Sequence, residues 1–197
     1  ASPFHPKAKR MVAGRKNWRR HLEAATVGWE NTIWFHCASL GEFEQGRSLI
    51  EAIRAKHPHR KILLSFFSPS GYEIRKHYAQ ADHVCYLPLD TPANAADFLR
   101  IAKPSMAVFV KYDLWLNLLQ ACDQNRIPVV LVSALVDAQS NFLKSALRGE
   151  YRKAFAAMHW VFTQDQNSKD LLAAFCGSDR ISVAGDTRFD RAAQLPE

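Results

Sequence analysis

Two carboxylates, Glu42 and Glu44, stand in a segment whose residue types and spacing could do chemistry. The segment, residues 41–48, reads GEFEQGRS, and it differs from a P-loop by one residue because Arg47 takes the place of the lysine. A P-loop binds phosphate through a nest of backbone N–H groups, and two carboxylates inside that nest would repel the anion. The dinucleotide pattern G-x-G-x-x-G is also absent after the apolar run at residues 32–39, which precedes the segment. The segment therefore does not predict a nucleotide site, and we expect Arg47 to pack along a helix.

Glu42 itself has two interpretations. A carboxylate in the first turn of a helix most often stabilises the helix dipole. A carboxylate at the mouth of a ligand crevice can instead accept a proton from an attacking hydroxyl group. The residues alone leave both interpretations open. Glu44 lies two positions further on, and we expect it to point away from such a crevice.

Seven short apolar runs recur along the chain and indicate the elements that position these carboxylates. The runs are rich in β-branched and aromatic residues and are continuous rather than alternating, which is typical of strands buried on both faces. They cover residues 32–39, 61–67, 83–89, 106–110, 128–134, 159–164 and 181–185. Segments of helical period separate them. The pattern predicts an α/β fold, a Rossmann-like, doubly wound and mostly parallel sheet.

Signals for helix starts agree with this arrangement. Thr91 and Pro92 fit an N-cap followed by proline at the first helical position, and Ser70 with Glu73 fits a capping box. In a doubly wound sheet, ligands bind outside the carboxyl ends of the strands. We therefore look for the site in the stretches that follow the strands, although their Ser, Asp, Thr and Gly residues also suit plain turns. These stretches are SLGEFE, SPSGYE, LDTP, KYDLW, SALVD and GDTRFD.

The positive charge of the chain is concentrated at its N-terminus. Of the net charge of +7, all comes from residues 1–22, which contain seven bases and no acid; the other 175 residues hold 19 of each. A nucleic-acid-binding domain more often spreads its bases over a folded face. A basic segment that also carries Met11, Val12, Trp18 and Leu22 fits an anionic membrane surface or a solvated helix docked on the domain.

The remaining composition describes one ordinary domain. The length of 197 residues and the 48% apolar content suit a single α/β unit with a real core. No run approaches 18 apolar residues, and the basic start is not followed by the apolar stretch of a signal peptide. The four cysteines are widely spaced, which favours buried reduced thiols over zinc ligands or disulfides.

Several of these stretches together resemble the N-terminal half of a 3-deoxy-D-manno-octulosonic acid (Kdo) transferase. The segments that carry the resemblance are HCASLGEFEQGRSLIEAI, SFFSPSGYE, CYLPLDTP, KPSMAVFVKYDLWLNLL, RIPVVLVSALV and VAGDTRFDR. It extends over residues 14–190, and its most specific part is the Ser-x-Gly-Glu turn from Ser39 to Glu42. The family uses the glutamate of this turn as its catalytic base, so the resemblance implies that role for Glu42.

The resemblance also implies an architecture and a pathway. Kdo transferases have the two-domain GT-B architecture, in which the first domain takes a lipid A precursor as acceptor and the second binds the donor CMP-Kdo in lipopolysaccharide synthesis in Gram-negative bacteria. We therefore expect a basic N-terminal segment over residues 1–26, an acceptor-binding domain over 27–185 and the start of an interdomain connection over 186–197. The donor domain would be missing from this chain, which alone should be inactive. A missing N-terminal helix or peripheral contact would hold the enzyme at the cytoplasmic face of the inner membrane.

The site residues implied by the resemblance fall into three groups. The catalytic base is Glu42, and Arg188 is expected near the donor. The acceptor-binding residues are expected to be Ser39, Gly41, Phe43, Ser68, Ser70, Lys111, Asp113 and Trp115. The chain departs from the family at Lys111, where the family has a glutamate, and at Arg188, where it has a lysine. No D-x-D motif occurs, so we expect no metal site and no cofactor other than the donor substrate.

Two other functions compete with this one. The chain could be a non-catalytic Rossmann-like binding module that recruits a partner. It could also belong to a GT-B glycosyltransferase with a different donor, because the half that would select the donor is not in the sequence. The residues alone do not decide between these alternatives. They point away from nucleic acid as a partner.

Overall fold

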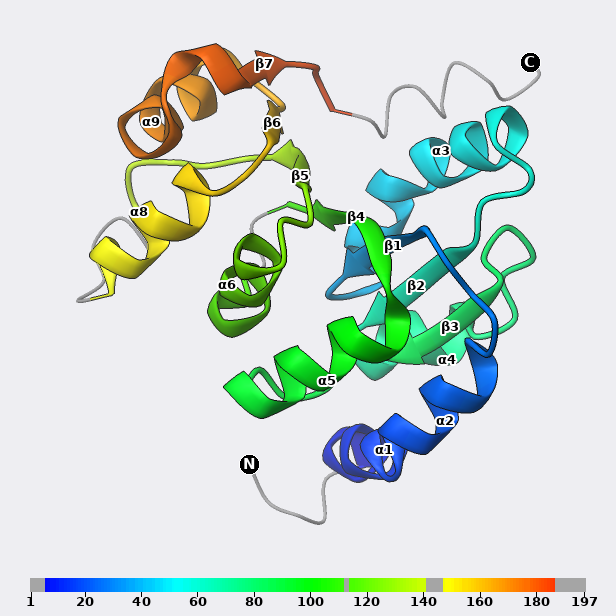
Figure 1. Cartoon of the computed structure of the whole chain (residues 1–197). Coiled ribbons are helices and arrows are strands. Elements are labelled where there is room, and N and C mark those ends of the chain that lie inside the picture. The colour runs from blue at the N-terminus through cyan, green and yellow to red at the C-terminus, as the bar shows by residue number, and fades with distance from the viewer. Residues whose placement is uncertain (1–5, 112–113, 141–146, 187–197) are drawn as a thin grey trace.

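The computed structural model describes residues 6–111, 114–140 and 147–186, and it contains one sheet of seven strands (Figure 1). Every strand pair is parallel, in the order β3-β2-β1-β4-β5-β6-β7. The strands are β1 Thr32–Cys37, β2 Ile62–Phe66, β3 His83–Tyr86, β4 Pro104–Val110, β5 Val129–Ala134, β6 Trp160–Thr163 and β7 Ile181–Val183. Each lies in one of the seven predicted runs or overlaps it. The predicted doubly wound parallel sheet is confirmed.

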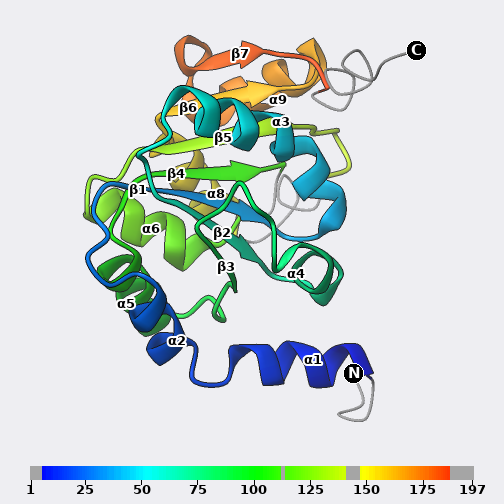
Figure 2. The same cartoon turned by 90° about the vertical axis from the view of Figure 1, so that its right-hand side faces the viewer.

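Helices cover both faces of the sheet, as the two views show (Figures 1 and 2). The α-helices are α1 Pro6–Arg15, α2 Trp18–Ala25, α3 Leu40–Lys56, α4 Pro69–Arg75, α5 Pro92–Ala102, α6 Leu116–Gln124, α8 Arg148–Ala156 and α9 Gln166–Cys176. On one face, α3 and α4 pack over a core that includes Phe35, Phe43 and Ile50. On the other face, the remaining core lies under α2, α5, α6, α8 and α9. Strands buried on both faces explain why the runs are continuously apolar.

The direction of winding reverses between β1 and β4. From β1 the chain proceeds through α3 to β2 and then to β3, whereas from β4 it proceeds through α6 to β5 on the opposite side. The loops after β1 and β4 therefore diverge, and such a switch point is where doubly wound sheets bind ligands, so it is the expected place of the ligand crevice. Residues 38–42 and Lys111 come directly after the two strands. The fold thus selects two of the stretches expected from the sequence as the walls of the crevice.

The helix starts agree in part with those predicted. Thr91 caps α5 by accepting the N–H of Asn94, and Pro92 occupies the first turn, as expected. The capping box predicted for Ser70 and Glu73 is wrong. α4 begins two residues earlier, because Ser68 is the N-cap and Pro69 takes the first position, where its missing N–H needs no partner.

The P-loop-like segment is helical rather than a loop. Helix α3 already begins at Leu40, so both glycines of the pattern lie within it. Gly46 is buried against β1 and β4, and a Cβ atom at this position would lie 2.9 Å from a methyl group of Val110. The second glycine therefore serves close packing between helix and sheet. This geometry provides no nest of N–H groups for phosphate.

The basic N-terminal segment forms α1 and α2, which pack beside the edge strand β3 (Figure 2). Leu22 of α2 is 2% exposed and belongs to the same core as the sheet. None of the helices in the described ranges is long and apolar enough to cross a membrane. The predicted boundaries at residues 26 and 185 stay predictions.

Candidate functional site

Glu42 lies in the first turn of α3, at the carboxyl end of β1. Its Oε2 atom accepts two hydrogen bonds from Ser39, one from the backbone N–H at 2.6 Å and one from the hydroxyl group at 2.8 Å. Among the residues that the structure describes, no donor is bonded to its other oxygen, Oε1. The side chain is only half-buried. The carboxylate is therefore fixed through one oxygen and has the second available to a ligand.

This geometry supports both interpretations of Glu42. The contact with the Ser39 N–H is the returning half of a capping box, which satisfies a donor that the helix leaves unpaired. The position in the first turn also suits the helix dipole. Neither role occupies Oε1, so the cap does not exclude proton transfer. Its role as the base stays a prediction.

Glu44 is directed to α4 instead. It forms an ion pair of 2.6 Å with Arg75, the last residue of α4, and lies 3.8 Å from Arg47. Arg47 in turn bonds Glu51 one helical turn further on at 2.7 Å, so it packs along the helix as predicted. The two glutamates of the segment therefore have separate surroundings, one at the start of α3 and one on the α3–α4 contact.

The turn after β2 lies beside the Ser39–Glu42 turn. The N–H of Ser68 donates to the carbonyl of Ala38 at 2.7 Å, which joins the ends of β1 and β2. Ser68 also accepts the hydroxyl of Ser70 at 3.1 Å. Gly41 and Ser70 are exposed. Four of the predicted acceptor residues, including Ser39, are thus gathered at this edge of the sheet.

Phe43 is a correction to the predicted set. It is 0% exposed and packs in the core against Phe66 and Tyr78, with ring centroids 5.8 and 4.9 Å away. One residue after Glu42, the helix turns the side chain by about 100°, which directs it to the sheet rather than to the crevice. Phe43 therefore stabilises the packing of α3 and cannot contact an acceptor.

Lys111 directly follows β4 on the other side of the switch point. Its backbone has a φ of 67°, in the left-handed region that non-glycine residues rarely adopt, and its N–H donates to the carbonyl of Val132 at 2.8 Å. Such conformations cost free energy and concentrate at functional sites. The strand order places this cation across the switch point from Glu42. Asp113 and Arg188, the other charged residues of the predicted set, lie outside the described residues.

Trp115 joins the crevice to the core through a histidine that the sequence did not single out. Its indole N–H donates to Nε2 of His36, which is 1% exposed, at 2.9 Å. Indole nitrogen is only a donor, so Nε2 must be the unprotonated nitrogen and the hydrogen must be on Nδ1. Nδ1 lies 2.9 Å from the hydroxyl of Ser65, which also accepts the indole N–H of Trp34 at 2.8 Å. The contacts assign one neutral tautomer and give His36 a positioning role.

Helix α6, which follows Trp115, receives its cap from another loop. The carboxylate of Asp90 accepts the N–H groups of Asn117 and Leu118, both at 3.0 Å. The side chain of Asn117 returns a bond of 3.0 Å to the Asp90 carbonyl. The LDTP stretch therefore contributes to the crevice by fixing the start of α6.

Cys37, at the end of β1, has an electrostatic environment that excludes it from the chemistry. Complete burial raises the pKa of its thiol well above the usual value, and the charge of Glu42 raises it further. A thiol that remains protonated is a poor nucleophile and a poor metal ligand. All four cysteines are free in the structure; Cys37, Cys122 and Cys176 are buried as predicted, whereas Cys85 is only partly buried.

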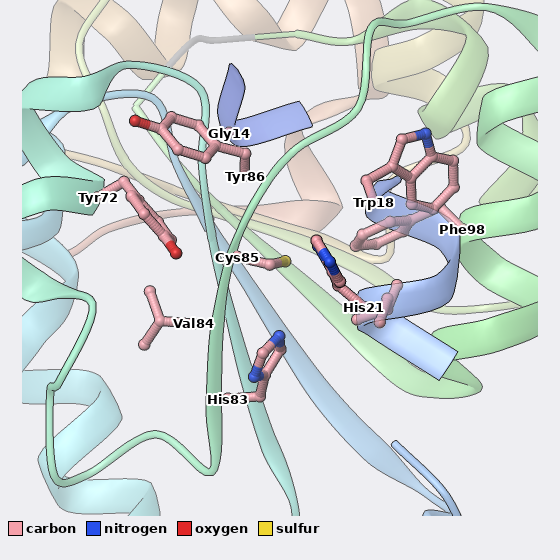
Figure 3. Close-up of a pocket in the computed structure, with 10 residues that line it drawn as sticks. Gly14, Trp18, His21, Tyr72, His83, Val84, Cys85, Tyr86 and Phe98 are labelled. Atoms are coloured by element: carbon pink, nitrogen blue, oxygen red, sulfur yellow. The ribbon is translucent and has the colours of Figure 1, made fainter. Parts of the chain in front are cut away.

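A separate cavity of about 230 Å³ lies between α2 and the edge strand β3 (Figure 3). Aromatic side chains and two histidines, His21 and His83, surround it. None of the predicted site residues lines it. It is distinct from the crevice, and its relevance here is that Gly14 and Tyr86 meet at its wall.

Comparison with known proteins identifies the family. Residues 9–191 match the family model described as 3-Deoxy-D-manno-octulosonic-acid transferase (kdotransferase). The chain is similar to 3-deoxy-D-manno-octulosonic acid transferase from Haemophilus influenzae, with 24% identity over 80% of this chain and 38% of the relative. It is also similar to the transferase of that name from Aquifex aeolicus, with 30% identity over 81% of this chain and 41% of the relative. This chain thus spans about two fifths of the length of these relatives.

Solved structures of similar fold belong to other enzymes. UDP-GlcNAc 2-epimerase from Neisseria meningitidis matches with a TM-score of 0.57 and 17% identity, over 81% of this chain and 48% of the other. The S. aureus MnaA–UDP structure matches with a TM-score of 0.61 and 13% identity, over 85% of this chain and 49% of the other. These likenesses support the fold alone. The family is shown by the match over residues 9–191: the chain belongs to the 3-deoxy-D-manno-octulosonic acid transferase family, as its sequence motifs predicted.

Proposed function

We propose that this chain is the acceptor-binding half of an inverting glycosyltransferase that transfers Kdo from CMP-Kdo to a lipid A precursor. The family match supports Kdo transfer. The observation that carries the proposal for this chain is the Glu42 carboxylate at the crevice, with Oε2 held by Ser39 and Oε1 available. A base needs such a fixed orientation with one free lone pair directed at the reacting hydroxyl group.

In the proposed step, a sugar hydroxyl of the acceptor attacks the anomeric carbon of Kdo. The new bond forms between the hydroxyl oxygen and that carbon, while the bond from the carbon to the phosphate oxygen breaks and CMP leaves with the electron pair. The hydroxyl proton passes to Oε1 of Glu42. Attack on the face opposite CMP inverts the configuration, through a transition state that resembles an oxocarbenium ion.

Lys111 is the proposed partner for an anionic group of the acceptor or the donor. It directly follows β4, the strand next to β1, and its left-handed backbone supports a functional role. The family has a glutamate at this position, so the substitution should change which charge the acceptor site tolerates. Ser39, Gly41, Ser68, Ser70 and Trp115 remain proposed acceptor contacts on the basis of their places around the crevice.

Part of the N-terminal basic segment is available for a membrane. Arg10, Lys16 and Arg20 are exposed, and Val12 on α1 is 74% exposed. Trp18 and Leu22, which the sequence suggested as membrane contacts, instead pack in the domain core. We propose peripheral association of α1 with the anionic cytoplasmic surface of the inner membrane, because bases near such a surface contribute on the order of 1 kcal/mol each.

The test is transfer of Kdo from CMP-Kdo to a lipid A precursor by a two-domain protein that contains this chain. We expect transfer by the two-domain protein and none by the 197-residue chain alone. A two-domain protein that binds the acceptor but transfers no sugar would favour the binding-module alternative. Transfer from a different sugar nucleotide would favour a glycosyltransferase with another donor.

A further inference from the structure

Arg15, at the end of α1, ties the N-terminal helices to the carboxyl ends of two strands. Its guanidinium donates to the carbonyl of Phe67, directly after β2, at 2.8 Å and to the carbonyl of Leu87, directly after β3, at 2.7 Å. A third bond of 3.0 Å reaches the carbonyl of Met11 in its own helix. The planar fork of arginine makes these three bonds through three different nitrogens, a spread of donors that the single ammonium nitrogen of lysine lacks. Burial lowers the pKa of Arg15, although the group remains charged.

The same guanidinium belongs to a stack of side chains that leads into the crevice. It lies 4.6 Å from the ring centroid of Phe67 and 5.2 Å from that of Tyr86. The Phe67 ring in turn lies 4.6 Å from the ring of Trp115. Trp115 bonds His36 and is the N-cap residue of α6, four residues after Lys111. Contacts between neighbours therefore run without a gap from α1 to the wall of the acceptor crevice.

Gly14 makes this docking sterically possible. A Cβ atom at position 14 would lie 2.2 Å from the ring of Tyr86, far inside contact distance. Figure 3 shows the two residues side by side above the cavity. Only a residue without a side chain lets α1 approach β3 closely enough for Arg15 to reach the carbonyls. The pair Gly14–Arg15 is thus built for a close contact with this edge of the sheet.

We propose that Arg15 is a positioning residue for the acceptor site: it fixes Phe67 and through it Trp115, so the crevice wall keeps its shape only while α1 is docked. The consequence for activity rests on the proposed function, since it concerns the affinity for the acceptor. The structural consequence concerns the Trp115 indole alone and does not depend on the reaction. Displacement of α1 therefore alters a site that α1 does not itself line.

Arg19 provides a matched control on the next helix. It bonds Asp97 at 2.6 Å and Asn94 at 2.8 Å, both on α5, and it lies 4.7 Å from the ring of Trp18. Like Arg15 it docks an N-terminal helix through a fork and a ring, but its bonds reach α5 rather than the Phe67–Trp115 pair. Arg15→Lys and Arg19→Lys therefore both weaken docking with charge retained, and only the first releases Phe67.

The first measurement uses the 197-residue chain labelled with ¹⁵N. The indole N–H signal of Trp115, assigned with Trp115→Phe, reports its bond to His36. We expect Arg15→Lys and Gly14→Ala each to shift this signal and Arg19→Lys to leave it in place. An unshifted signal in a folded Arg15→Lys chain overturns the proposal, and so does an equal shift in Arg19→Lys.

The second measurement uses the two-domain enzyme. Arg15→Lys should raise the acceptor KM about two- to thirtyfold, the range seen for residues that act through a packed network, with kcat little changed. Arg19→Lys should leave KM at the wild-type value. An unchanged acceptor KM in Arg15→Lys overturns the proposal. If the wild-type enzyme transfers no Kdo, the proposed function fails, whereas the indole measurement still decides the role of Arg15.

Discussion

Replacement of Glu42 by glutamine separates its two roles. A glutamine at this position keeps a carbonyl oxygen that can accept the N–H of Ser39, and capping boxes use Gln as well as Glu. The neutral amide cannot accept the proton of an attacking hydroxyl group. Glu42→Ala removes both roles, so comparison of the two variants isolates the base. Glu42→Gln should therefore slow catalysis strongly and largely preserve the helix start.

The expected magnitudes differ enough to be measured apart. Loss of a general base typically slows a reaction about 100- to 10,000-fold, which corresponds to about 2.7–5.5 kcal/mol of activation free energy. Loss of a charge at a helix N-terminus costs only about 0.3–1 kcal/mol of unfolding free energy. For a chain of this size, about 1 kcal/mol lowers Tm by roughly 2–4 °C. Glu42→Gln should thus melt within a few degrees of the wild type while transfer nearly disappears.

Glu44→Gln is the control with the opposite expectation. Glu44 pairs with Arg75 at 2.6 Å, and both side chains are about a quarter exposed. Its substitution should lower Tm but leave Kdo transfer intact, because Glu44 faces α4. The assay is Kdo transfer by the two-domain enzyme, with Tm measured on the 197-residue chain. Near wild-type transfer by Glu42→Gln would refute the assignment of the base, and a role in the helix dipole alone would appear as a slightly lower Tm with normal turnover.

Three further measurements test the remaining reasoning. Co-sedimentation with anionic vesicles should fall when Arg10 and Lys16 are both replaced by Glu and when salt is raised, since surface charge is screened; equal binding to neutral vesicles would contradict the membrane proposal. Calorimetry on the 197-residue chain should show weak or no binding of ATP, because the P-loop-like segment is helical. CMP should also bind weakly or not at all, because the donor is expected to bind in the other domain. Tight ATP binding would overturn the conclusion about the P-loop-like segment. Burial and the nearby His21 lower the pKa of His83 in the folded protein. The stability that this shift contributes is complete above the pKa of the unfolded chain, about 6.5, and it is lost as the pH falls from there through the lower pKa of the folded protein. Between pH 7 and 5, the Tm of the wild type should therefore fall more steeply than the Tm of His83→Gln. Parallel curves of Tm against pH would contradict this.

The fold was predictable from sequence because its signals are local. Each strand is a short, continuous apolar run, and each connection has helical period, so the order of elements and the parallel sheet follow from periodicity. The start of α5 was predictable for the same reason, because Thr91 and Pro92 are neighbours. For α4, two serines competed as caps, and Pro69 decided the outcome by fixing its own position at the first turn.

The contacts that shape the site were not predictable because they are long-range. His36 acquires its tautomer from Ser65, which faces it across the β1–β2 register, and from Trp115, which lies 79 residues away. Asp90 caps a helix that begins 26 positions later, at Leu116. The local signal for a polar group in the core is His36 itself, which lies within an apolar run and on the same face of the strand as Trp34, two residues earlier.

The two interpretations of Glu42 become complementary in the folded protein. A free carboxylate on a helix surface samples several rotamers. If this freedom is lost only in the transition state, the entropy cost adds to the activation free energy. Ser39 removes this cost in advance, because its N–H and hydroxyl both bind Oε2 and leave Oε1 as the outward atom. The cap is therefore the means by which the base is oriented. Ser39→Ala retains the backbone bond but loses the hydroxyl bond of 2.8 Å, so it should reduce kcat by less than Glu42→Gln while it retains the base. Loss of transfer as complete as in Glu42→Gln would indicate instead that the Ser39 hydroxyl itself contacts the reacting groups.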